Sequence, residues 1–244
     1  MEIVNNKTER PLAHYRDLFA AADPVKMAAQ SCADYSEQTK KFTVMVLGHP
    51  FFVSWPDASF LTTPIYFAPK EKTVSEIDAH STASAIARQA KAQAEAAEHG
   101  NLMVPIISPE LTILLLRILL EGSAMPAKTH FIAYQEIPKG AAYLPAFNRR
   151  CTQRLAKQFE EADQLAEACQ AMGASPIDSK ADTAWQFEFL PGLFVQFLFW
   201  EGDDEFPAQS QILFSNNITS FFSSEDAVVI AEIIIRAISQ GYVS

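Results

Sequence analysis

The chain has 244 residues, of which 49% are hydrophobic and 20% are charged, a composition ordinary for a globular protein with a buried core. Its 19 Lys and Arg against 29 Asp and Glu give a net charge of −10 without any basic run, which argues against nucleic acid and anionic membranes as partners. The 3 cysteines are far apart and form no C-x-x-C pair, so we expect a reduced, cytoplasmic protein with neither an iron-sulfur cluster nor zinc. The sequence shows no signal peptide and no apolar stretch of the roughly 20 residues that a membrane span needs.

The first part of the chain is predicted to be a helical extension covering residues 1–40. Residues 11–22 have the spacing of a short amphipathic helix, and Asp23 followed by Pro24 is typical of the cap and first position of a second helix. The apolar side of the first helix comprises Leu12, Tyr15, Leu18 and Phe19.

Strand-like segments follow this extension. Residues 42–47 and 51–55 are rich in β-branched and aromatic side chains, and the Gly-His-Pro between them predicts a hairpin. We expect another strand within residues 59–67. The Ala-rich residues 74–98 then predict a helix, which we interpret as a helical insertion at 72–100 in a single domain spanning residues 1–244.

A buried core helix is predicted next. Ser108 and Pro109 are typical of a helix start, the following residues are almost all apolar, and Gly122 suits the left-handed position at the helix end. Residues 131–137 predict a strand that ends at Pro138.

Two further helical regions are predicted in the second half of the chain. Between Phe147 and Gly173 apolar residues recur every three or four positions, which indicates one amphipathic helix or two in tandem with cysteines on the apolar side. Residues 225–239 predict a last helix, in which Glu232 is placed to pair with Arg236.

The densest aromatic segment runs from Trp185 to Asn217. Residues 185–190 alternate as in a half-buried strand, Pro191-Gly192 predicts a tight turn, and the apolar run 193–200 predicts a central strand covered on both faces. Residues 211–214 supply a third strand. The fold class that follows is α+β, with one mainly antiparallel sheet of the N-terminal hairpin, 131–137 and this meander, covered by the 109–121 and 225–239 helices.

Several segments resemble family 3786 of domains of unknown function over most of residues 42–238. The most specific part is W-x-G-D-x-E-F-P followed by I-L-F. The segments are VLGHPFFVSWP (46–56), ILLLRILLEG (113–122), FIAYQEIPKGAAYLPAFNRR (131–150), FLFWEGDDEFPAQSQILFSNNI (197–218) and SSEDAV (223–228). The resemblance implies a context in anaerobic bacteria and archaea, where some members carry an attached iron-sulfur segment, and it implies no mechanism. This chain lacks clustered cysteines, and its residues 74–98 have no counterpart in the family.

One candidate site is the acidic segment after the central strand. Four carboxylates within five positions repel one another, so they lie in water, share protons or hold a cation. The spacing does not fit an EF-hand loop, whereas Mg²⁺ needs only one or two protein carboxylates. The candidate metal ligands are Asp203, Asp204 and Glu205, and the alternative is a solvated turn.

A second candidate site surrounds the I-P-K-G turn. A carboxylate at a strand end, followed by a helix with two arginines, suits a small anion or a salt bridge between elements. The candidate ligand-binding residues are Tyr134, Glu136, Tyr143, Arg149 and Trp200. We further expect Arg149 or Arg150 to contact the acidic segment, so that both candidate sites form one cleft.

These observations leave three functions open. The preferred one is a non-catalytic accessory domain that binds a small ligand or a protein partner, with a link to anaerobic metallocofactor metabolism that comes only from the resemblance. The second is an enzyme that depends on a divalent cation such as Mg²⁺, with Glu136 as base and the metal at Asp203, Asp204 and Glu205. The third is a structural subunit, which exposed aromatic patches would indicate.

Overall fold

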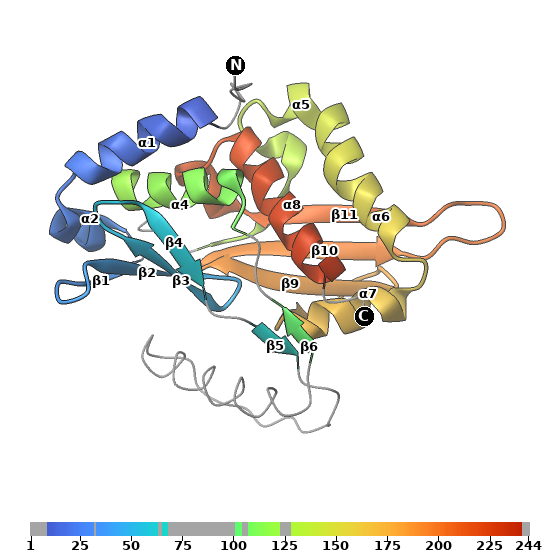
Figure 1. Cartoon of the computed structure of the whole chain (residues 1–244). Helices are drawn as coiled ribbons and strands as arrows, with labels where there is room; N and C mark the ends of the chain where they lie inside the picture. The colour runs from blue at the N-terminus through green and yellow to red at the C-terminus, as the bar shows by residue number, and fades with distance from the viewer. Residues whose placement is uncertain are drawn as a thin grey trace, which may run out of the picture.

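The computed structural model describes residues 9–31, 33–62, 65–67, 101–103, 107–122 and 128–240 of the chain. Within these residues antiparallel sheets pack against helices, so the predicted α+β class is confirmed (Figure 1). The helix predicted at 74–98 and the insertion at 72–100 lie outside the described residues. No helix of the described part is long and apolar enough to span a lipid bilayer.

Helices and strands are mixed along the chain in the order that the labels follow. The helices are α1 (Glu9–Ala21), α2 (Pro24–Gln30), α4 (Pro109–Glu121), α5 (Gly140–Phe147), α6 (Gln153–Gln158), α7 (Ala162–Ala171) and α8 (Ser224–Gln240). The strands are β1 (Asp34–Ser36), β2 (Lys41–Val46), β3 (His49–Ser54), β4 (Ser59–Thr62), β5 (Ile65–Phe67), β6 (Asn101–Met103), β7 (Phe131–Ala133), β8 (Ser175–Pro176), β9 (Thr183–Leu190), β10 (Leu193–Trp200) and β11 (Gln209–Ser215). Shorter helical turns are the 3₁₀ turns Tyr134–Glu136 and Asn216–Ser220 and the π-helical turn Asn148–Thr152.

The strands form two larger sheets, where the sequence predicted one. The first has the order β1-β2-β3-β4 and the second the order β7-β11-β10-β9-β8, while β5 and β6 pair with each other. A backbone hydrogen bond from Leu47 N to Phe189 O, 3.0 Å long, links the β2–β3 turn to the end of β9. The N-terminal hairpin therefore abuts the second sheet instead of extending it.

The predicted N-terminal hairpin exists, with a tighter turn than expected. Leu47 and Gly48 both have positive φ, 50° and 75°, as the mirror-image turns of two-residue hairpins require. His49 and Pro50 consequently belong to β3, where they pair with Val46 and Met45.

The second sheet has a buried face built on β10. Val195, Phe197 and Phe199 are fully buried, and the side chains between them in β10 are half-buried. Cross-strand partners continue this face, because Phe197 lies opposite Trp185 on β9 and Ile212 on β11. The meander predicted from the aromatic segment is confirmed.

The helices complete a single hydrophobic cluster with this sheet. Figure 1 shows α8 crossing the second sheet, with α4 on one side of it and α5 and α6 on the other. The predicted cap of α4 is present, since Ser108 Oγ accepts a hydrogen bond from Leu111 N at 3.2 Å. α1 contributes Phe19 to the cluster, whereas Leu18 is 45% exposed, so the predicted apolar side of that helix was too wide.

The strand predicted over residues 131–137 is wrong in its second half. β7 ends at Ala133, and residues 134–136 form a 3₁₀ turn. Glu136 stabilises this turn because its Oε2 accepts a hydrogen bond from Ala133 N at 2.7 Å. The region from Phe147 to Gly173 is helical in two parts, as predicted, with a break at Phe159.

Candidate functional site

Two of the predicted ligand-binding residues serve the local fold around the 3₁₀ turn. Tyr134 is only 2% exposed, and its ring stacks on Phe147 with centroids 4.0 Å apart and planes 3° from parallel. Burial raises the pKa of the Tyr134 hydroxyl. Glu136 is engaged with the backbone of Ala133, as described above, so its carboxylate caps the turn.

The I-P-K-G turn that follows is also explained by backbone geometry. Lys139 adopts a left-handed conformation with φ 68°. A Cβ atom at Gly140 would lie 2.0 Å from the carbonyl oxygen of Tyr134, so only glycine permits α5 to start this close to the 3₁₀ turn.

The other three predicted residues lie on different elements. Tyr143 is 51% exposed on α5, Arg149 is exposed on the π-helical turn, and Trp200 is half-buried at the end of β10 opposite Gln209. Trp200 was predicted to end a strand buried on both faces, but its side chain belongs to the half-buried face. The structure therefore does not gather the five predicted residues into one site.

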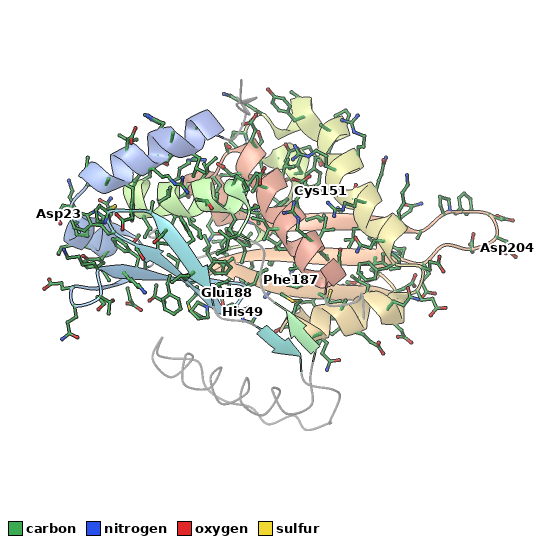
Figure 2. All side chains as sticks on the ribbon, viewed as in Figure 1. Asp23, His49, Cys151, Phe187, Glu188 and Asp204 are labelled. Carbon is green, nitrogen blue, oxygen red and sulfur yellow. The ribbon has the colours of Figure 1, made fainter. Side chains whose placement is uncertain are left out.

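The acidic loop (residues 201–206) projects from the end of the second sheet. Asp203, Asp204 and Glu205 are exposed, and Figure 2 shows Asp204 at the tip of the loop, away from the helices. Asp203 Oδ1 accepts hydrogen bonds from Glu205 N at 2.9 Å and Phe206 N at 2.7 Å, and these bonds lower the pKa of Asp203. In the described ranges, no three or more His, Cys, Asp or Glu side chains are grouped so that they could hold a metal ion.

The predicted contact between the arginines and the acidic loop is wrong. Arg150 makes a two-pronged ion pair with Glu232 of α8, with Nε–Oε1 2.8 Å and Nη2–Oε2 2.7 Å. The hydrogen bond to Glu232 is the main reason that the pKa of Arg150 is raised. No ion pair joins Arg149 or Arg150 to the acidic loop among the residues that the structure describes. Glu232, predicted to pair with Arg236 on its own helix, instead ties α8 to the π-helical turn.

The arginines belong to a different feature, which we call the basic groove. It is an open hollow of about 530 Å³ beside α6 and α8. Its lining residues are Arg149, Arg150, Gln153, Arg154, Lys157, Gln158 and Glu232. Four cationic side chains and one carboxylate thus lie together in a chain whose net charge is −10.

Helix geometry explains why these cations share one side. Arg150, Arg154 and Lys157 are four and three positions apart, which places them on the same face of a helix. Gln153 N bonds to Asn148 O across the π-helical turn. Such wide turns insert an extra residue into a helix and are frequent at functional sites.

A second hollow, which we call the polar pocket, adjoins the basic groove. It has a volume of about 270 Å³ and shares Gln153 with the groove. Its lining residues are Ala133, Tyr134, Gln135, Phe147, Asn148, Thr152, Gln153, Ser210, Gln211 and Ile212. None of these described residues has a charged side chain.

Sequence reasoning found two of the four cations of the basic groove. Arg149 and Arg150 were singled out, but with the wrong partner, and Arg154 and Lys157 were missed. The signal was present, because R-R-x-x-x-R-x-x-K repeats at helical spacing on the side opposite the buried Leu155. Of the polar pocket, sequence reasoning found Tyr134 alone, since the lining residues come from four separate segments.

The described cysteines are core residues, as predicted. Cys151 and Cys169 are fully buried, and burial raises the pKa of the Cys151 thiol to about 12 and raises that of Cys169 as well. Cys32 lies outside the described residues.

Comparison with known proteins gives one match. The family model described as "Domain of unknown function (DUF3786)" matches residues 82–237, which include every residue of the basic groove and of the polar pocket. The resemblance found in the sequence is confirmed, with two corrections to its extent. The match begins after the N-terminal hairpin, which we had included, and it covers residues 82–98, part of the 74–98 segment for which we expected no counterpart in the family. No curated protein and no solved structure matches the chain.

Proposed function

The chain belongs to the DUF3786 family, and from that premise we propose that it is a non-catalytic protein that binds a small anionic ligand in the basic groove. The observation that carries this proposal is the gathering of Arg149, Arg150, Arg154 and Lys157 around one hollow, whose described lining residues include one carboxylate, Glu232. Because Glu232 is bonded to Arg150, it offsets one of the four positive charges. A net charge of about three therefore faces the groove.

The chemistry of these side chains suits an anion with several oxygen atoms. Arginine presents planar N–H forks that bind carboxylate or phosphate oxygens in pairs, and lysine adds a mobile point charge. Arg149, Arg154 and Lys157 have no ion-pair partner within the part of the chain that the structure describes. Their donors are therefore free to bind a ligand.

Binding is better supported than catalysis at this place. The groove contains cations and amides, which hold and orient an anion. Glu232, the carboxylate among its described lining residues, accepts two hydrogen bonds from Arg150 and so is not poised to take a proton from a substrate. A volume of about 530 Å³ is in the range of small-molecule sites.

The test is calorimetric titration with inorganic phosphate at low ionic strength. The test variant is Arg154→Gln with Lys157→Gln, and the matched control is Arg16→Gln with Lys26→Gln, which removes the same charges from exposed positions on α1 and α2. Loss of two charge-assisted contacts should weaken phosphate binding roughly tenfold in the test variant. The control should bind as the wild type does, and added salt should weaken both.

Two results would contradict the proposal. The first is absence of phosphate binding by the wild-type protein at low ionic strength. The second is an equal loss in the test variant and the control, because binding would then depend on overall charge instead of on the groove.

A link to anaerobic metallocofactor metabolism is implied by the resemblance alone. A protein partner with an acidic surface would use the same cations, and phosphate would compete with it.

A further inference from the structure

We propose that the ligand is a hydroxylated anion of the sugar-phosphate class, whose charged group lies in the basic groove and whose hydroxyl-bearing part enters the polar pocket. This inference rests on the proposed function, because it takes the groove as the anion site. The polar pocket then holds the second part of the ligand, and its side chains bind the ligand's hydroxyl groups.

Gln153 is a lining residue of both hollows, so the polar pocket and the basic groove adjoin at this residue. Gln153 lies between Arg150 and Arg154 on the same helical run. A molecule held by these arginines can therefore extend past Gln153 into the pocket.

Two hydroxyl groups of the polar pocket already donate to the backbone. Ser210 Oγ donates to Thr152 O at 2.7 Å, and Thr152 Oγ1 donates to Asn148 O at 3.1 Å. Each hydroxyl has used its one donor and keeps lone pairs that accept. The pocket thus offers hydroxyl acceptors that are held in place by the backbone.

Free amide groups add both donors and acceptors. Gln135, Gln153 and Gln211 make no side-chain hydrogen bond to any other residue that the structure describes. An amide presents an N–H₂ donor and a carbonyl acceptor, and a ligand hydroxyl needs both kinds of partner. A wall of amides and hydroxyls without charge is therefore suited to a polyol.

The polar pocket lies beside a part of β11 that pairs with a strand on one side only. β7 pairs with β11 only over Leu213 to Ser215, so the Gln209–Ile212 part of β11 has a strand neighbour, β10, on one side only. An edge strand leaves backbone groups available for pairing. The pocket volume of about 270 Å³ is below the usual range for whole ligands, which suits one sugar-sized part of a larger molecule.

The experiment compares inorganic phosphate with glycerol 3-phosphate, ribose 5-phosphate and glucose 6-phosphate by calorimetric titration of the full chain. The wild type should bind at least one of the three phosphorylated polyols roughly tenfold more tightly than phosphate. Gln135→Ala with Gln211→Ala should remove that gain and leave phosphate binding unchanged. The matched control, Gln170→Ala with Gln209→Ala, changes exposed glutamines outside the pocket and should keep the gain.

The outcomes separate the two proposals. Phosphate binding with no gain for any of the three polyols overturns the sugar-phosphate inference and leaves the basic groove as an anion site. A gain that survives in the Gln135→Ala, Gln211→Ala variant also overturns it, because the polyol then lies elsewhere. Absence of phosphate binding overturns the proposed function itself.

Discussion

Neighbouring carboxylates in the acidic loop have different roles. Glu201 Oε1 accepts a hydrogen bond from Ala162 N at 2.6 Å, so it caps the start of α7, which lacks a side-chain cap of its own. Asp203 closes the loop on itself through the amides of Glu205 and Phe206. Repulsion among the acids is reduced because two of them are held by backbone N–H groups instead of facing one another.

The role of Asp203 can be tested by its titration. Because the backbone hydrogen bonds favour the ionised form, the pKa of Asp203 lies below its usual value of 3.8. The stabilisation of the loop is present above the unfolded pKa and is lost as the pH falls through the lowered, folded pKa. In NMR spectra recorded along a pH series, the amide protons of Glu205 and Phe206 should shift together at that lowered midpoint.

Two substitutions sharpen this measurement. Asp203→Asn should abolish the common titration of both amide protons, whereas Asp204→Asn, one position along, should leave it in place. A midpoint at or above the usual value, or equal effects of both substitutions, would show that the loop is not closed by Asp203.

At the scale of elements, β10 shows how a strand can be fully apolar and still have two unlike faces. The apolar run predicts cover on both sides, but only alternate residues such as Phe199 are fully buried, and Trp200 is half-buried. Apolar residues on a half-buried face are common, since much of a protein surface is apolar. The run length alone could not distinguish the two cases.

Truncation of these two neighbours should separate the faces. Phe199→Ala removes a fully buried ring and should cost about 3–5 kcal/mol of unfolding free energy. Trp200→Ala should cost clearly less, although it deletes the larger side chain, because part of its surface already faces water. Denaturant unfolding of both variants measures the difference, and an equal or larger loss for Trp200 would place it in the core.

Local signals predicted most elements, and long-range contacts explain most of the errors. The helix starts at Asp23 and Ser108 were readable because a cap depends on residues two or three positions away. The end of β7 is an exception, because it was missed although Glu136 caps the turn only three positions from Ala133. The polar pocket was not predicted as a site because it forms only where β11 passes the π-helical turn.

At the scale of the whole molecule, α8 is held by ion pairs from two other segments. Arg117 of α4 lies 2.6 Å from Asp226, and Arg150 of the π-helical turn is paired with Glu232. Asp226 also accepts hydrogen bonds from the backbone and hydroxyl of Ser223, so it caps α8 as well. These contacts lie within the residues matched by the family, whereas the first sheet precedes them. Because Glu232 of α8 lines the basic groove, the shape of the groove depends on how these ion pairs position α8.

The coupling between Arg150 and Glu232 is the last prediction, and a double-mutant cycle measures it. The Arg150 side chain is 49% exposed, so solvent screening limits the pair to about 0.5–1 kcal/mol despite its two-pronged geometry. Unfolding free energies of the wild type, Arg150→Ala, Glu232→Ala and the double variant give this term. The matched cycle of Arg149→Ala with Asp204→Ala should give coupling of about zero, within the roughly 0.3–0.5 kcal/mol expected for separate sites. Coupling in the second cycle and none in the first would return Arg149 to the acidic loop and remove the basic groove as a separate surface.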